Sequence, residues 1–238
     1  MFKNWLVVLL GLFLLKPVFS QEPVFYLFPG QGSDSRIFDS LNLDANFTKV
    51  YIDYPDPNRK ESLNQYAMRF VSKIDTNLPY YFIGVSLGGM ICAELNEVLN
   101  PEKCILISSA KNKNEIPNRY RFMRWFPIYK VIPAAVYKWS SYFVQPLFEP
   151  DRKRNKETFK VMLKAKNPKF IKRATHMIVQ WQLMKNNHEI YSIHGEKDHT
   201  LPLKKNNHNY VVDDGSHMMM LTKGTKISGL INQIIEMR

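Results

Sequence analysis

Cysteine is scarce in this sequence. Only Cys92 and Cys104 occur among its 238 residues, which excludes a small scaffold held together by several disulfides. The surrounding pattern places Cys92 within a predicted helix and Cys104 at the start of the next strand, at the end far from that helix. Because a disulfide needs Cα atoms within roughly 7 Å of each other, we expect two free, buried thiols.

Metal-binding patterns are also missing. The sequence contains no CxxC and no HExxH motif, and its nearest histidine pairs, His194/His199 and His208/His217, have no such motif beside them. The sequence therefore implies no metal ion and no other cofactor.

Long apolar runs are absent except for one at the N-terminus, and that run is short. Residues 5–15 are apolar and are followed by Lys16 and Pro17, well below the roughly 20 residues that span a bilayer. A basic start, a short apolar segment and the small residue Ser20 before Gln21 are typical of a signal peptide rather than an uncleaved anchor. We expect residues 1–20 to be removed near Ser20 and the mature protein to be exported, either periplasmic or secreted.

The rest of the chain suits one domain with an insertion, because 45% of the residues are hydrophobic and 13% are aromatic. Short apolar runs alternate with stretches of helical spacing such as 63–74 and 227–235. The runs are 24–28, 49–53, 80–84, 103–108, 190–194 and 210–213. This alternation predicts an α/β fold with a mostly parallel central sheet of about six strands flanked by helices.

The alternation is interrupted between residues 110 and 188, which are rich in aromatic and basic residues and contain six prolines. We expect a helical cap inserted after the fourth strand, with the core formed by residues 21–109 and 189–238. Eight aromatic residues of this segment are expected either to line an acyl pocket or to form the core of the cap. They are Trp125, Phe126, Tyr129, Tyr137, Trp139, Tyr142, Phe143 and Phe148.

Positive charge is concentrated in the same segment. Residues 110–188 carry 18 Lys/Arg and 4 Asp/Glu, a net charge of +14, whereas the remainder carries 15 and 17, a net of −2. We expect this surface either to attract anionic amphiphiles or an anionic membrane surface, or to be a solvated basic face. Nucleic acid is not an expected partner, because no recognition motif accompanies the charge and the protein is expected to be exported.

The strongest chemical motif is GVSLG at residues 84–88. It matches G-x-S-x-G between a predicted strand and a predicted helix at 90–99. Such a sharp turn lifts the serine hydroxyl above the edge of the sheet and leaves no room for Cβ atoms at the glycines. The helix N-terminus beside it stabilises negative charge. The motif therefore predicts Ser86 as a nucleophile.

A serine nucleophile needs a base that accepts its proton and an acid that orients the base. Asp198 follows the fifth predicted strand and His217 follows the sixth. Because the carboxyl ends of parallel strands gather at one edge of a sheet, we expect Ser86, Asp198 and His217 to meet there. Rival acids lie in the same loops: Glu196, Asp213 and Asp214. Four other histidines are expected to be solvated and to have no catalytic role: His176, His188, His199 and His208.

The loop after the first strand, FPGQGS at residues 28–33, is rich in glycine. We expect the main-chain amide of Gln31, together with that of Leu87, to form an oxyanion hole. The alternative is a tight turn that uses its glycines only for positive φ.

Together these motifs resemble the α/β-hydrolase superfamily, from about Val24 to the C-terminus. PGQGSDSRIF is similar to the family's oxyanion loop, GVSLGGM to its nucleophile elbow, IHGEKDHTLP to its acid turn and DDGSHMM to its histidine loop. The resemblance implies a cap after the strand that ends near Ser108. It also implies a full set of site residues: Ser86 as nucleophile, Asp198 as acid, His217 as base, and Gln31 and Leu87 as oxyanion donors.

Two features depart from the family pattern. Pro29 stands where many members have the histidine of an HG dipeptide, and the two N-terminal antiparallel strands of larger members are not apparent. A serine nucleophile also argues against the dehalogenase and epoxide-hydrolase branches, which use aspartate.

The sequence thus predicts a serine hydrolase that cleaves a carboxylic ester, or a related acyl bond, of a small molecule through an acyl-enzyme on Ser86. The alternative is a non-catalytic protein of the same fold that binds an anionic partner or membrane surface through its basic cap.

Overall fold

The computed structural model describes residues 22–43, 47–148, 156–203 and 208–237, and for residues 142–148 and 156 it describes the backbone only. The predicted signal peptide, residues 1–20, lies outside the described residues. No helix in these ranges is both long and apolar enough to cross a membrane.

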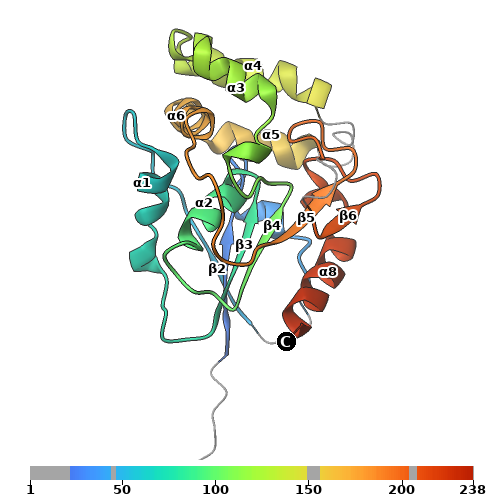
Figure 1. Cartoon of the computed structure of the whole chain (residues 1–238). Coiled ribbons are helices and arrows are strands. Elements are labelled where there is room, and N and C mark those ends of the chain that lie inside the picture. Colours follow the sequence, from blue (N-terminus) through green and yellow to red (C-terminus); the bar gives the residue numbers. More distant parts are fainter. Residues whose placement is uncertain (1–21, 44–46, 149–155, 204–207, 238) are drawn as a thin grey trace, which may run out of the picture.

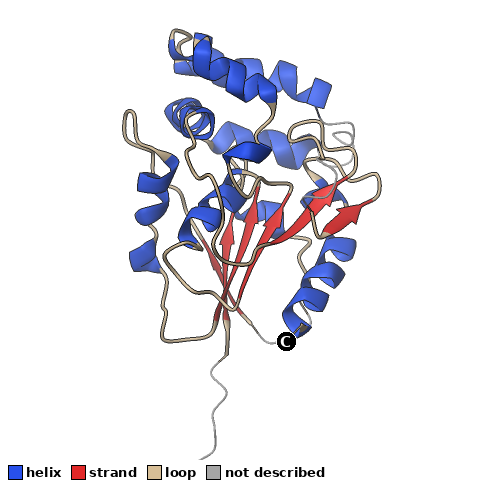
Figure 2. Ribbon diagram, in the orientation of Figure 1, coloured by secondary structure: helices blue, strands red, loops and turns tan. Residues whose placement is uncertain are grey.

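Six parallel strands form one open sheet in the order β2-β1-β3-β4-β5-β6 (Figure 2). They are β1 Val24–Phe28, β2 Thr48–Tyr51, β3 Tyr80–Val85, β4 Lys103–Ile107, β5 Tyr191–Gly195 and β6 Tyr210–Val212. The predicted α/β fold with a parallel sheet is therefore confirmed. The predicted second strand was too long at its end, because β2 stops at Tyr51 rather than at Asp53.

Helices connect the strands and cover both faces of the sheet (Figure 1). They are α1 Leu63–Met68, α2 Leu87–Leu95, α3 Asn118–Trp125, α4 Ala134–Phe148, α5 Lys156–Ala165, α6 Pro168–Val179, α7 Met219–Thr222 and α8 Gly224–Glu236. A capping box begins α1: the Ser62 hydroxyl accepts a hydrogen bond from the Gln65 amide, and the Gln65 side chain accepts one from the Ser62 amide. The predicted helix at 63–74 is α-helical only to Met68 and ends in a short 3₁₀ turn at 71–73.

The central strands are buried on both faces. Phe82 and Leu106 belong to a cluster with side chains of α1, α2 and α6, whereas Ile83 and Ile105 belong to a second cluster with side chains of α7 and α8. Successive residues of a strand point to opposite faces, so both must be apolar. This explains why the strand sequences show apolar runs without alternation.

Helices α3 to α6 lie between β4 and β5 in the sequence and stand over the carboxyl edge of the sheet (Figure 1). The innermost of them, α6, contacts α1 as well as α3 and α4. Its residues Phe170, Ala174 and Met177 are buried in the same cluster as α1 and α2. By contrast, α3 has no buried residue. The segment thus has an inner helix that joins the core and an outer helix that is largely exposed.

The two cysteines are free thiols, buried in α2 and β4. Burial raises the pKa of both thiols, which keeps them protonated and unreactive at neutral pH.

Candidate active site

Ser86 occupies the sharp turn between β3 and α2. Its backbone is in an unusual conformation, with φ 53° and ψ −119°, and a non-glycine residue with positive φ is strained. Two hydrogen bonds to the end of β4 hold it there: the Ser86 amide donates to Ile107 O at 3.0 Å, and the Ser109 hydroxyl donates to Ser86 O at 2.6 Å. The neighbouring strand therefore fixes the position of the serine hydroxyl.

Gly88 allows the first turn of α2 to lie directly against the loop after β1. A Cβ atom at this position would be 2.0 Å from Phe28 O and 2.6 Å from Pro29 O. Its backbone φ is not positive, so glycine is needed for the close approach and not for the turn itself. This contact brings the helix N-terminus and the predicted oxyanion loop together.

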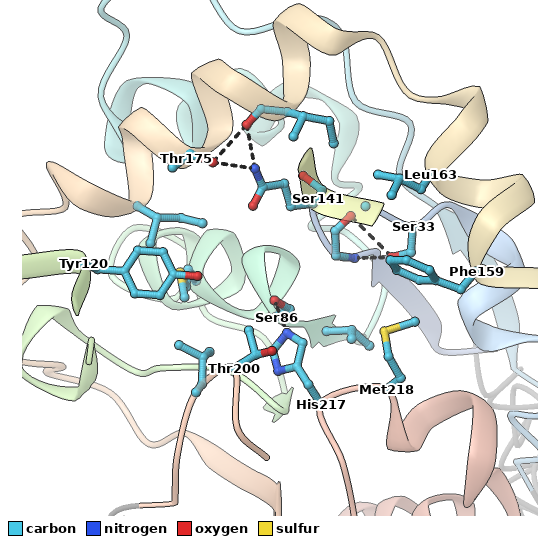
Figure 3. A pocket seen from close by; sticks show the side chains of 18 of the residues that line it. Ser33, Ser86, Tyr120, Ser141, Phe159, Leu163, Thr175, Thr200, His217 and Met218 are labelled. Carbon is cyan, nitrogen blue, oxygen red and sulfur yellow. Dashed lines mark hydrogen bonds between the residues drawn. The ribbon is translucent and has the colours of Figure 1, made fainter. Parts of the chain in front are cut away.

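Ser86, His217 and Asp198 form a hydrogen-bonded chain at the carboxyl edge of the sheet. Figure 3 shows Ser86 and His217 of this chain at the floor of a pocket. His217 Nε2 is 2.8 Å from Ser86 Oγ, and His217 Nδ1 is 2.9 Å from Asp198 Oδ2. A carboxylate only accepts hydrogen bonds, so Nδ1 carries the proton and Nε2 presents its lone pair to the serine hydroxyl. The structure thus brings the three predicted residues together in the predicted order.

Asp198 is almost completely buried, with 1% of its surface exposed. Burial alone would raise the pKa of its carboxyl, but the charge and hydrogen bond of His217, with smaller contributions from His194 and the Leu201 amide, hold that pKa below its ordinary value. The Leu201 amide donates to Oδ1 at 2.7 Å. Asp198 is therefore ionised at neutral pH and held on both oxygens.

A second buried histidine, which sequence reasoning missed, lies beside this carboxylate. His194 Nε2 is 2.6 Å from Leu201 O and 3.4 Å from Asp198 Oδ2. Its ring packs on that of His208, with centroids 4.2 Å apart, and burial lowers the pKa of His194. The available signal was an ionisable side chain within the predicted strand 190–194, four residues before Asp198.

Two histidines expected to be solvated are half-buried and hydrogen-bonded instead. His208 Nδ1 lies 2.8 Å from the Ser192 hydroxyl, and His176 Nδ1 lies 2.8 Å from that of Tyr129. The prediction was wrong for both, because packing against β5 and the cap removes them from water. His188 and His199 are exposed, as predicted.

The acid loop and the histidine loop are locked together. A Cβ atom at Gly195 would lie 2.3 Å from Gly215 O, and the Lys197 amide donates to Gly215 O at 2.8 Å. The two loops can approach this closely only because glycines face one another. The distance between Asp198 and His217 therefore depends on this contact.

The rival acids lie on the surface. Asp214 pairs with Lys197 at 2.5 Å and Asp213 with Lys226 at 3.3 Å, while Glu196 accepts a hydrogen bond from the Asp214 amide. Asp198 is the carboxylate that touches His217.

The glycine-rich loop after β1 lies beside Ser86. The Gly30 amide is occupied, because it donates to Ser33 Oγ at 2.8 Å. Among the described residues, no acceptor is bound by the main-chain amides of Gln31 and Leu87, the two donors predicted for the oxyanion hole. Neither Gly30 nor Gly32 has positive φ, so the alternative of a turn built on left-handed glycines is wrong.

The Gln31 side chain joins this loop to the cap. Its amide group donates to Ile171 O at 2.6 Å and to Thr175 Oγ1 at 2.9 Å, both in α6 (Figure 3). Tyr137 of α4 donates to the same threonine oxygen. The loop is therefore held between the sheet edge and α6.

A cavity of about 430 Å³ opens above Ser86 and His217. It lies between the carboxyl edge of the sheet and helices α3 to α6, and most of its lining is apolar. Its side chains include Met90, Tyr120, Met123, Phe159, Leu163 and Ile178. An apolar pocket of this size with a few polar groups at one end is typical of small-molecule sites.

The aromatic residues predicted to line a pocket mostly do not. Tyr137 does, but Trp125, Phe126 and Trp139 are exposed, because the helix faces that carry them point away from the sheet. Tyr129 is buried, which fits the alternative that such residues form the core of the cap. The side chains of the other predicted residues lie outside the described part: Tyr142, Phe143 and Phe148.

Arg119 of α3 connects the cap to the acid loop. Its guanidinium lines the cavity and donates to the main-chain oxygens of His199 and Thr200. Within the described ranges, no group of three or more His, Cys, Asp or Glu side chains is arranged to hold a metal ion.

No family model and no curated protein matches the chain by sequence. Solved structures do match it. A hydrolase from Pseudomonas aeruginosa has a TM-score of 0.65 at 14% identity, with 91% of each chain covered. An esterase from Exiguobacterium antarcticum has a TM-score of 0.62 at 13% identity, with 92% of this chain and 93% of the esterase covered. Est816, an N-acyl homoserine lactone degrading enzyme, has a TM-score of 0.64 at 16% identity, with 89% and 92% covered.

Proposed function

We propose that this chain, which has the α/β-hydrolase fold, is a serine hydrolase that cleaves a carboxylic ester or a related acyl bond. The observation that carries the proposal is the hydrogen bond between Ser86 Oγ and a histidine whose other nitrogen is held by a buried carboxylate. The names of the structural neighbours, which include esterases and a lactone-degrading enzyme, support it.

In the first half of the cycle, Ser86 Oγ attacks the carbonyl carbon while His217 Nε2 takes its proton. The imidazolium that forms is stabilised by Asp198, which stays ionised. The tetrahedral oxyanion accepts hydrogen bonds from the amides of Gln31 and Leu87. His217 then gives its proton to the leaving alkoxide, so that the alcohol departs and an acyl-serine remains.

In the second half, a water molecule takes the place of the alcohol. His217 Nε2 removes a proton from the water as its oxygen attacks the acyl carbon. Collapse of the second tetrahedral intermediate breaks the bond to Ser86 Oγ, which recovers its proton from His217. The products are a carboxylic acid and an alcohol, and neither half requires a cofactor.

The substrate is a small acyl ester whose apolar part occupies the cavity above Ser86. Met90, Met123 and Leu163 provide apolar contacts there. We further propose an anionic or amphiphilic substrate, because residues 110–188 carry a net charge of +14 and such a field concentrates anions near the entrance. For an anionic ester, kcat/KM should then fall as ionic strength rises from tens to hundreds of millimolar, with a neutral ester little affected.

The non-catalytic alternative has less support. A site that had lost its activity would not need the strained backbone of Ser86, the ionised buried Asp198 or the close contact between the acid loop and the histidine loop.

A fluorophosphonate probe, followed by peptide mapping, tests the proposal directly. We expect one label per chain, on Ser86, and none on a Ser86→Ala variant. A panel of p-nitrophenyl esters of increasing acyl length then measures turnover. A folded protein that neither reacts with the probe nor hydrolyses any ester would favour the non-catalytic alternative.

We also propose that the protein is exported, on the basis of the N-terminal sequence alone. Mass spectrometry of the native protein should find a mature chain that starts near Gln21. An intact Met1 on a cytosolic product would contradict export.

A further inference from the structure

The outer surface of the cap exposes large apolar side chains. Five residues of α3 and the turn that follows it are each more than half exposed, from Phe122 and Phe126 at 58% to Trp125 at 82%. We call them the outer cap face: Phe122, Trp125, Phe126, Ile128 and Val131. Clusters of exposed apolar side chains mark interaction surfaces, whereas single ones need no explanation.

The two sides of α3 differ sharply. Tyr120 and Met123 line the cavity above Ser86. On the opposite side of the same helix, Phe122, Arg124 and Trp125 are exposed. The exposed aromatic side chains are therefore not required for packing against the inner helices. In Figure 1, α3 and α4 form the uppermost layer of the molecule, beyond α5 and α6, so this side of the molecule is accessible to a large partner.

The charge of this surface is predominantly positive. Between residues 116 and 148 the chain has no Asp or Glu and five Lys or Arg. Arg121 and Arg124 are exposed, and with Lys113 and Trp125 they line a cavity of about 320 Å³ beside the C-terminal end of α6. Arginine guanidinium groups beside an indole are well suited to a phosphate group at an apolar boundary.

We propose that the outer cap face docks on the surface of an anionic lipid bilayer. Trp125 and Phe126 enter the headgroup region, and Arg121 and Arg124 bind lipid phosphates. A surface with exposed aromatic residues, several cations and no carboxylate between residues 116 and 148 matches the composition of interfacial membrane-binding segments. A second copy of the chain is a poorer occupant, because each copy carries a net charge of +12 and would bring the same cations face to face.

Docking does not depend on the proposed hydrolysis, so either proposal can be refuted without the other. The Ser86→Ala protein should lose ester turnover and still bind vesicles. Failure to bind vesicles would leave the fluorophosphonate and ester assays unaffected.

The test uses the full chain with vesicles of phosphatidylcholine, with and without phosphatidylglycerol, in a co-sedimentation assay at low salt. Two double variants remove the proposed contacts: Trp125→Ala with Phe126→Ser, and Arg121→Glu with Arg124→Glu. Two matched controls alter exposed residues of the core, outside residues 110–188: Val98→Ser with Val211→Ser, and Lys73→Glu with Lys49→Glu. Every variant has the same residues 1–20, so differences in binding report the altered surface.

We expect the chain to prefer phosphatidylglycerol vesicles. Each of the two cap variants should bind them about tenfold or more weakly, while the controls bind within about twofold. Brominated lipids should quench tryptophan emission less in Trp125→Phe than in the unaltered chain, which places the indole at the bilayer even if residues 1–20 also bind lipid. Melting temperatures should be unchanged, because the altered side chains are exposed.

Three results would overturn the proposal. One is equal binding of the cap variants and their controls. Another is equal quenching of the unaltered chain and Trp125→Phe. The third is a dimer, detected by light scattering, that the cap variants abolish without any change in vesicle binding, since the face would then be an interface between copies.

Discussion

His194 Nε2 lies 3.4 Å from Oδ2 of Asp198, the same oxygen that accepts the hydrogen bond from His217. Because Nε2 is also 2.6 Å from Leu201 O, an acceptor, that nitrogen carries the proton. Two imidazoles thus present N–H groups to one buried carboxylate. His194 is on β5, and the acid loop leaves the end of that strand. The His194 side chain is therefore placed to hold the acid loop in position and to stabilise the negative charge of Asp198.

We expect His194→Leu to lower kcat about tenfold while KM changes little, because the acid loop loses its anchor at Leu201 O and Asp198 orients His217 less well. Without the Nε2–H group the pKa of Asp198 rises, so the acid limb of the kcat/KM profile should move to higher pH. Steady-state kinetics between pH 4 and 9 measure both effects.

His194→Gln is the matched control, since its amide can still donate from nearly the same place. It should recover most of kcat and restore the acid limb. If His194→Leu lowers only the melting temperature and leaves kcat and the pH profile unchanged, His194 is a packing residue.

Replacement of either member of the proton-transfer pair should remove nearly all turnover. We expect Ser86→Ala and His217→Ala to lower kcat by similar factors, on the order of 10³ or more, because the two residues act as one unit. The double variant should be no worse than the single ones. Circular dichroism and melting curves check the fold. More than a few per cent of residual activity in Ser86→Ala would refute the assignment of Ser86 as the nucleophile.

Asp198→Asn should cause a large but smaller defect, about 10²- to 10³-fold in kcat, because the acid orients and stabilises the histidine and does not itself attack. Asp213→Asn and Asp214→Asn are the controls. Both residues form surface ion pairs, so their replacement should alter kcat less than twofold. If Asp198→Asn left kcat unchanged while Asp214→Asn lowered it strongly, the acid that orients His217 would instead belong to the histidine loop.

The protein should lose stability as the pH falls from about 6.5 toward 3. Burial, with the neighbouring charges of His194 and Lys111, lowers the pKa of His208 to about 3. The unfolded chain, in which this histidine has an ordinary pKa near 6.5, then binds more protons than the folded chain throughout that range. His208 therefore does not reduce the free energy of unfolding above about pH 6.5. Below that pH it reduces this free energy progressively.

Urea denaturation between pH 7 and 4 measures this slope. His208→Gln keeps a hydrogen-bonding side chain beside Ser192 without titrating, so its free energy of unfolding should fall less steeply with decreasing pH. Parallel slopes for the two proteins would show that His208 is not responsible.

The length of acyl chain that is accepted should depend on Met123, which faces the cavity. Met123→Trp fills part of that space, so kcat/KM for long-chain p-nitrophenyl esters should fall about tenfold relative to the acetate ester. Phe122→Trp, one residue away on the outer side of α3, should leave this ratio unchanged. Equal effects of the two variants would mean that the acyl group does not enter past α3.

The sequence by itself determined the order of the elements and the three loops that carry the chemistry. Apolar runs at six places predicted the six strands, because strands covered on both faces need apolar residues at every position. GVSLG at 84–88 predicted the turn at Ser86 because its conformation excludes larger flanking residues. Such signals are local in the sequence, and local sterics decide them.

Only the tertiary structure decided which side chains meet. Asp198 differs from Asp214 in burial and in its contact with His217, and neither property is visible in a loop sequence. The role of His194 and the burial of His208 depend on packing between β5 and its neighbours. The outward direction of Trp125, against the prediction of a pocket wall, depends on how α3 lies across α6. An aromatic residue in a helix has the same sequence signal on either face, and the free energy of packing against distant residues chooses between them.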